Sequence, residues 1–152
     1  MKLLGVLAVL VLGLANAQTL PEFKLEDTSG NVVTLATLKG KPALVVFWAT
    51  WCGVCASELP QLRELATKDK LDVYLLSVSD SPGEVRSFLA EYKLSMFKPL
   101  FRHAGGDNCT AVAERWHVVG QPVSFALDAR GRLVARYAGY VDAATVRKAL
   151  GL

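Results

Sequence analysis

The fold of this chain is decided by residues 42–60, PALVVFWATWCGVCASELP. Their first part, Ala43 to Trp48, is an unbroken apolar run, which predicts a buried strand. Cys52 and Cys55 follow, with two residues between them. Beyond them, apolar residues recur at helical spacing at positions 59, 62, 65 and 66. We therefore expect both cysteines where a buried strand gives way to a helix.

A helix start suits thiol chemistry. Its first N–H groups are unpaired and lie at the positive end of the macrodipole, and both features stabilise a thiolate. Cys52 is nearer to the helix start, so it is predicted to attack, while Cys55, one turn further on, is predicted to resolve. The alternatives are a static disulfide, which would constrain the unfolded chain little, and a metal pair. A metal would need two more ligands, and the soft or borderline candidates are His103, His117 and Cys109.

The motif Phe47-Trp-Ala-Thr-Trp-Cys-Gly-Val-Cys55 resembles the active-site stretch of thioredoxin-fold thiol–disulfide oxidoreductases, and most closely that of the TlpA/ResA/CcmG-like branch. The resemblance runs from about Phe23 to the C-terminus. It implies an α/β thioredoxin-like fold, with a central mixed sheet flanked by helices, an N-terminal β-hairpin and an inserted helix and strand at about 80–106. It also implies a cis proline beside the cysteines, and Pro122 is similar to that residue.

The resemblance places other residues around the sulfurs as a substrate-binding surface: Trp51, Gly53, Val54 and Gln121. Two of them depart from the family pattern. Val54 stands where thioredoxin has proline, and Gln121 precedes the cis proline where Thr, Ile or Val is usual. The resemblance therefore predicts the class of reaction but not the reduction potential. Trp48 is expected in the core and Trp51 on the rim of the site.

Glu58 lies three residues after Cys55, so a helix places both on the same side. ResA-like proteins carry a glutamate at this place, near the cysteines, where it tunes their titration. Thioredoxin instead has a buried Asp in the strand, at the position occupied here by Val46. We expect Glu58 to act as a general acid and base for Cys55. The alternative is a solvated carboxylate near the helix N-terminus.

The rest of the chain alternates strands and helices. A β-hairpin is predicted from Leu20 to Thr34, with its turn at residues 27–31 and a single helical turn after it at Leu35 to Lys39. A strand at Leu71 to Val78 follows the active-site helix, which implies a right-handed parallel crossover. The further expected elements are a helix from Ser81 to about Lys93 with a Ser81–Glu84 capping box, a strand at Leu100 to Arg102, a helix at Cys109 to Trp116, a strand opened by Pro122, a strand at Leu133 to Tyr137 and a last helix from Asp142 to Leu150.

The chain has 152 residues and a formal net charge of +3, which suits one domain with a real core and gives no sign of nucleic-acid binding. Residues 1–17 are predicted to be a signal peptide. Lys2 is its positive end, Leu3 to Leu14 its apolar core and Ala15-Asn-Ala17 its cleavage site. An uncleaved N-terminal anchor is the alternative. Residues 18–152 would then form a thioredoxin-like domain in the periplasm or cell envelope, where disulfides persist.

The sequence thus predicts an extracytoplasmic enzyme that reduces disulfides in protein substrates through Cys52 and Cys55, with cytochrome c maturation as one possible pathway. It would need no cofactor besides that disulfide, and a membrane thiol-electron transporter would supply electrons. The alternatives are a net disulfide oxidant, a copper carrier resembling Sco-type proteins and a peroxiredoxin. Sco-type proteins use Cys-x-x-x-Cys and a distal His, so the spacing argues against a carrier. A peroxiredoxin needs two residues between its Thr and its Cys, and Thr50 and Cys52 have one. Cys109 is expected to be free and buried, and a regulatory or intermolecular disulfide is the alternative.

Overall fold

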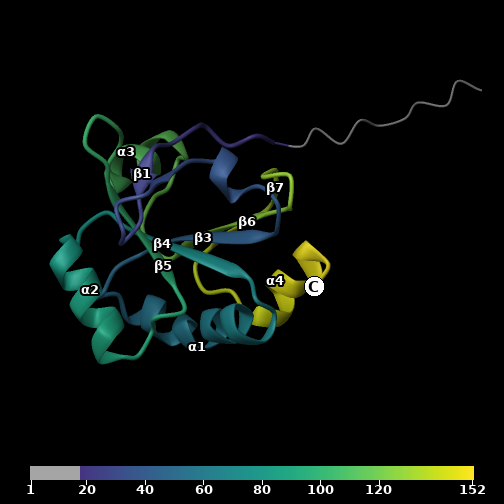
Figure 1. The fold of residues 1–152 in the computed structure, drawn as a ribbon. Helices are drawn as coiled ribbons and strands as arrows, with labels where there is room; N and C mark the ends of the chain where they lie inside the picture. The colour runs from purple at the N-terminus through teal and green to yellow at the C-terminus, as the bar shows by residue number, and fades with distance from the viewer. Residues whose placement is uncertain (1–17) are drawn as a thin grey trace, which may run out of the picture.

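The computed structural model describes residues 18–152, so the predicted signal segment lies outside the described residues. A mixed seven-stranded sheet, in the order β2-β1-β5-β4-β3-β6-β7, runs through them (Figure 1). The strands are β1 (Leu25–Glu26), β2 (Val32–Val33), β3 (Ala43–Trp48), β4 (Asp72–Ser77), β5 (Lys98–Arg102), β6 (Val123–Leu127) and β7 (Leu133–Ala138).

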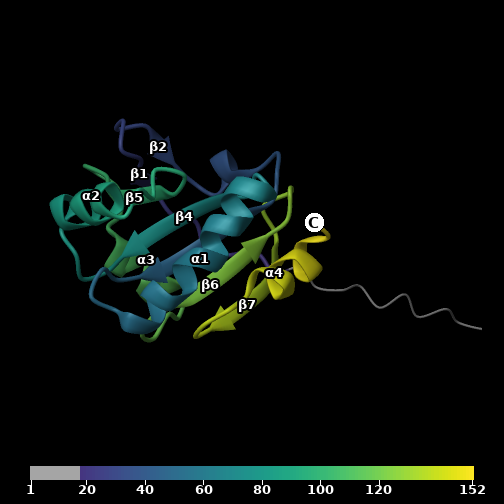
Figure 2. The ribbon, with the colours of Figure 1, turned by 90° about the horizontal axis from the view of Figure 1, so that it is seen from below.

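Helices cover both faces of the sheet. On one face lie α1 (Gly53–Lys68), α2 (Pro82–Glu91) and α4 (Ala143–Leu150), and on the other lie α3 (Cys109–Arg115) and the short 3-10 helix η1 (Ala36–Leu38). Figure 2 shows α1 lying over the middle of the sheet and α4 over β6 and the edge strand β7. This three-layer arrangement confirms the predicted α/β class with a mixed sheet.

The strand β3 lies at the centre of the sheet. It pairs in parallel with β4 and antiparallel with β6, and all six of its residues are buried. A strand with both faces covered needs apolar residues at every position, which explains the unbroken run of the sequence. The path β3–α1–β4 is the predicted parallel crossover, and it sets Cys52 at the carboxyl end of β3.

Two hydrophobic clusters hold the layers together. Beneath α1, α2 and α4 the core is mostly aliphatic, with Trp48, Phe97 and Phe101 as its buried aromatic residues, and Leu62 and Leu65 are its leucines from the active-site helix. On the opposite face the aromatic rings of Phe23, Phe47, Trp116 and Phe125 pack edge to face, with centroids 5.0 to 5.9 Å apart. Burial of this kind contributes about 25 cal/mol per Å² of apolar surface, so the two clusters dominate the stability of the fold.

The local signals for helix ends are confirmed. Ser81 and Glu84 form the reciprocal capping box of α2, and Asp142 caps α4. After the hairpin, the boundaries lie within one residue of expectation, apart from two that differ by two residues. α2 ends at Glu91, because Lys93 takes a left-handed conformation with φ 53°, and β5 begins at Lys98, before the expected Leu100. Within residues 18–152, no helix has the length and apolar content needed to cross a membrane.

The N-terminal hairpin is confirmed, and it is built into the main sheet. Its strand β1 pairs antiparallel with β2 and also with β5, where Leu25 faces Arg102. The inserted α2 and β5 therefore provide the edge on which the hairpin sits. The hairpin covers the edge strand β5, which would otherwise offer unpaired backbone groups to other chains.

Candidate active site

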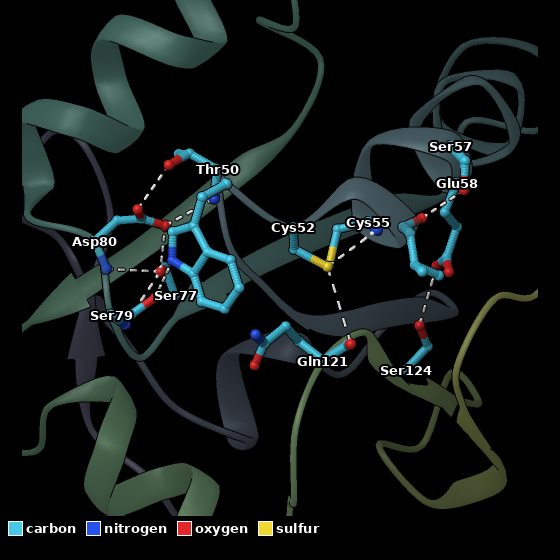
Figure 3. Close-up of a disulfide and its surroundings, with 12 residues drawn as sticks. Thr50, Cys52, Cys55, Ser57, Glu58, Ser77, Ser79, Asp80, Gln121 and Ser124 are labelled. Carbon is cyan, nitrogen blue, oxygen red and sulfur yellow. Dashed lines mark hydrogen bonds between the residues drawn. A yellow bond between two sulfur atoms is a disulfide. The ribbon is translucent and has the colours of Figure 1, made fainter.

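Cys52 and Cys55 form a disulfide where β3 is connected to α1, at the carboxyl end of the central strand (Figure 3). Cys52 is the N-cap of α1 in an extended conformation, and its amide donates to the carbonyl of Ala49 at 3.2 Å. The amide of Cys55 donates to Sγ of Cys52 at 3.2 Å. Sγ of Cys52 therefore takes the place that a side-chain oxygen occupies at an ordinary N-cap, and the helix N-terminus faces it.

The two sulfurs differ in access. Cys52 is 7% exposed and Cys55 is 2% exposed, so Cys52 is the one nearer the surface. Trp51 and Val54 stand beside them with exposed fractions of 67% and 52%. The structure thus places Trp51 on the rim, as predicted, while Trp48 is buried in the core against Phe88.

The loop before β6 forms the other side of the site. The peptide bond between Gln121 and Pro122 is cis, as the resemblance implied. The carbonyl oxygen of Gln121 lies 3.9 Å from Sγ of Cys52, which brings this loop and the helix start together (Figure 3). Val119, in the same loop, is 90% exposed. Sequence reasoning missed Val119, because an apolar residue next to an apolar strand gives no sign of exposure.

Glu58 is buried, with an exposed fraction of 1%. Its Oε1 accepts from Oγ of Ser124 at 3.4 Å, and its Oε2 accepts from the amide of Val141 at 3.3 Å. Burial raises the pKa of Glu58 to about 7, although these two hydrogen bonds favour the charged form. The alternative of a solvated carboxylate is therefore wrong.

Ser124 and Val141 are residues of this site that sequence reasoning missed. Ser124 is the one polar residue of a buried strand, VSFAL, and that break in an apolar run was the available signal. Val141 takes part through its backbone amide, so no side-chain pattern could have indicated it.

A second carboxylate, Asp80, holds the segment that leads to Cys52. It accepts hydrogen bonds from the amide and hydroxyl of Thr50 and from the hydroxyl of Ser77, while Ser79 accepts from the indole N–H of Trp51 (Figure 3). No pattern in the sequence indicated any of these contacts.

The residues considered as metal ligands lie apart. Nδ1 of His103 lies 3.2 Å from Oε2 of Glu26 on the hairpin, and His117 follows α3 with a left-handed φ of 54°. Cys109 is a free, buried thiol, as expected, whose Sγ donates to the carbonyl of Leu100 at 3.4 Å. In the described part of the chain, no group of three or more His, Cys, Asp or Glu residues could hold a metal ion.

Comparison with known proteins places this geometry in a family. The family model described as Redoxin matches residues 15–150. The thiol-disulfide oxidoreductase ResA of Bacillus thuringiensis is 29% identical over 122 residues, which cover 78% of this chain and 67% of that protein. The thiol:disulfide interchange protein DsbE of Pseudomonas fluorescens is 34% identical over 123 residues, which cover 80% of this chain and 66% of that protein.

A solved structure of a related protein has the same fold. The crystal structure of a thio-disulfide isomerase from Thermus thermophilus is 37% identical and superposes with a TM-score of 0.74, covering 88% of this chain and 92% of that one. In this chain the disulfide lies at a helix start, with a buried carboxylate on the same helix and a cis proline in the adjacent loop. The chain therefore belongs to the Redoxin family, and it is a thiol–disulfide oxidoreductase of thioredoxin-like fold related to ResA and DsbE.

Proposed function

We propose that this protein reduces disulfide bonds in other proteins outside the cytoplasm, with Cys52 as the attacking thiol, Cys55 as the resolving thiol and Glu58 as the proton acceptor. The observation that carries the proposal is the set of charges around the pair. Between residues 42 and 62 the only charged side chain is the carboxylate of Glu58, and no cationic side chain lies among these residues.

The direction of electron flow follows from those charges. A strong oxidant of this class stabilises its reduced form, because a thiolate at the helix start is favoured by neighbouring positive groups. Here Gly53 and Val54 lie between the cysteines and carry no charge, and a carboxylate lies one turn after Cys55. A negative group disfavours the thiolate. The reduced form is therefore a good electron donor.

The reaction balances without a cofactor. The thiolate of Cys52 attacks one sulfur of the substrate disulfide, forming a mixed disulfide and releasing one substrate thiolate. Cys55 then loses its proton to Glu58 and attacks Sγ of Cys52, which forms the Cys52–Cys55 disulfide and releases the second substrate thiolate. Two electrons pass to the substrate, and Glu58, with a pKa of about 7, returns the proton to solvent.

The rim gives the substrate a place to bind. Trp51 and Val54, next to the cysteines in the chain, and Val119, in the loop whose Gln121 carbonyl reaches Cys52, are exposed apolar groups. Gln121 and Pro122 lie in the loop whose carbonyl reaches Sγ of Cys52, and Gly53, directly after Cys52, has no side chain. An extended peptide can lie along Gln121 in β-augmentation while its neighbouring side chains contact the rim.

The source of electrons and the location complete the proposal. The oxidised pair must be reduced again, and we assign that step to a membrane thiol-electron transporter. Residues 1–17 would direct the chain to the periplasm or envelope, either as a cleaved signal or as an anchor. Cytochrome c maturation is one pathway that needs such a reductant. Mass spectrometry of the native protein should find an N-terminus at Gln18, whereas the intact chain in the membrane fraction would favour the anchor.

The reduction potential of the Cys52–Cys55 couple tests the proposed direction. Equilibration of the protein with defined ratios of oxidised and reduced dithiothreitol, read by alkylation and mass, should give about −270 mV or lower, the range of thioredoxin. A value above about −180 mV, the range of oxidising catalysts, would show that the protein is a net oxidant.

A further inference from the structure

The segment between β3 and α1 is held from the side by one carboxylate. Oδ2 of Asp80 accepts from the amide of Thr50 at 2.9 Å, and Oδ1 accepts from the hydroxyl of Thr50 at 2.6 Å. Oδ2 also accepts from Oγ of Ser77 at 2.7 Å. We call these three residues the Asp80 cluster.

The Asp80 cluster rests on rigid elements. Ser77 is the last residue of β4, and its Oγ accepts from the amide of Asp80 at 3.0 Å. Ser81, the residue after Asp80, is the N-cap of α2 and forms its capping box with Glu84. Asp80 is thus fixed between a central strand and a capped helix, and the short bonds to Thr50 transfer that fixed position to the segment before Cys52.

The charge of Asp80 is maintained in this setting. Partial burial would raise its pKa, but the hydrogen bonds from Thr50 and Ser77 outweigh that effect and hold the pKa below its usual range. A permanently ionised acceptor makes stronger hydrogen bonds than a neutral one, so the cluster keeps its geometry through the pH range in which thiols titrate.

The neighbouring contact extends this control to the exposed rim. The indole N–H of Trp51 donates to Oγ of Ser79 at 3.1 Å, while the side chain is 67% exposed. The loop that carries Asp80 therefore also fixes the orientation of the Trp51 ring. A rigid aromatic side chain loses little conformational entropy on binding, which suits it to be an anchor for a partner.

From this geometry we propose that Asp80 is a positioning residue, which together with Thr50 and Ser79 holds Trp51 in a fixed orientation. In that orientation the Trp51 ring contacts a side chain next to the substrate disulfide and so determines which substrates bind. The inference rests on the proposed function, because it assigns Trp51 a role in binding protein disulfides. It adds that the loop after β4, distant in sequence from the cysteines, determines how well a protein substrate docks.

Kinetics with a protein disulfide and with a small dithiol test this role. Oxidised insulin is the protein substrate, and dithiothreitol, which is too small to contact the rim, probes the disulfide itself. Asp80→Asn should raise the KM for insulin about 10-fold, or ~1.4 kcal/mol, and leave kcat and the rate of reduction by dithiothreitol within about twofold of wild type. An unchanged KM for insulin would overturn the proposal. An equal loss of rate in the reduction of the protein by dithiothreitol would overturn it too, since that would mean the variant damages the cysteines.

The chain offers a matched control and a rescue pair. Asp128 also accepts hydrogen bonds from neighbouring amides and an arginine, in the turn after β6 at the opposite end of the sheet, so Asp128→Asn should leave the KM unchanged. Thr50→Val removes the hydroxyl and should raise the KM, whereas Thr50→Ser keeps it and should not. If Asp80→Asn fails to fold, the comparison of Thr50→Val with Thr50→Ser tests the proposal instead. Equal effects of these two variants on the KM for insulin would overturn it.

Fluorescence tests the orientation of Trp51 without any turnover. Trp48 and Trp116 are buried, so emission that acrylamide quenches comes from Trp51. Ser79→Ala should add a fast component to the anisotropy decay of that emission and raise the KM for insulin. An unchanged decay would overturn the restraint on Trp51. If the wild type failed to reduce insulin, the proposed function would fall, while the decay would still decide whether the loop fixes this ring.

Discussion

Oγ of Ser124 lies 3.4 Å from Oε1 of Glu58, and Ser124 is the residue of β6 that pairs with Val46 of β3. Antiparallel partners share a face of the sheet, with their Cβ atoms about 5 Å apart. The carboxyl of Glu58 therefore reaches from α1 to the sheet beside Val46, the position at which thioredoxin carries its buried Asp. The chain supplies a buried acid at this place from the helix instead of from the strand.

The burial of Glu58 predicts how stability depends on pH. Its folded pKa, about 7, is above the value of 4.5 for an unperturbed Glu, so the folded state binds the proton more tightly. Stability should be highest at low pH and fall as the pH rises from 4.5 to 7, by on the order of 3 kcal/mol. Glu58→Gln cannot ionise, so at about pH 8 the oxidised variant should be more stable than wild type by a similar amount.

Urea unfolding of the oxidised proteins at about pH 5 and pH 8 measures this difference, and the disulfide keeps the active-site thiols from titrating. The exposed Glu114 of α3 provides the control, because Glu114→Gln should leave the pH dependence intact. If the free energy of unfolding of the wild type, corrected by the control, were the same at pH 8 as at pH 5, ionisation of Glu58 would not destabilise the fold.

The same substitution should change the two half-reactions in opposite directions. Without the negative charge the thiolate of Cys52 is easier to form, so alkylation of the reduced Glu58→Gln protein at about pH 7 should be a few-fold faster than in wild type. Resolution of a mixed disulfide by Cys55 needs a proton acceptor, and it should be slower by about 100-fold. Alkylation rates from about pH 6 to 9 and stopped-flow release of substrate thiol measure both. Superimposable profiles would mean that the proton passes directly to water.

Local signals account for what the sequence predicted well. The apolar run of β3, the Ser81–Glu84 box of α2 and the Asp142 cap of α4 each depend on neighbours in the chain, so they could be identified without the fold. The cysteine motif identified the start of α1 for the same reason. The resemblance to a known family then supplied the cis bond before Pro122, which no local pattern indicates.

Contacts between distant segments could not be predicted. The bonds from Thr50 to Asp80 and from Ser124 to Glu58 span 30 and 66 residues. Both bonds depend on the register of β3 against β4 and β6, which brings the segments that carry these residues side by side. A one-residue slip of a strand would turn its side chains to the other face of the sheet. The pairing of β1 with β5 escaped prediction in the same way, since strands of two residues carry almost no pattern.

The unequal access of the two cysteines predicts which one attacks. Cys52 caps the helix and is nearer the surface, whereas Cys55 is buried behind it. Cys55→Ser should therefore accumulate mixed disulfides with protein substrates through Cys52, and Cys52→Ser should accumulate few or none. Non-reducing gels and mass spectrometry after incubation with oxidised insulin count the adducts. Equal trapping by both variants would contradict the assignment.

The third cysteine, Cys109, should not react in thiol–disulfide exchange. Cys109 is 7% exposed, its Sγ donates to the carbonyl of Leu100, and burial raises its pKa to about 12. Because the thiolate is the reactive form, iodoacetamide should leave the native oxidised protein unmodified at about pH 8 and add one group per chain in guanidinium chloride. Cys109→Ala should cost about 1 kcal/mol of stability, through the lost sulfur contacts, and leave insulin reduction unchanged. Labelling of the native protein, or a Cys109-linked dimer on a non-reducing gel, would instead support a regulatory or intermolecular disulfide.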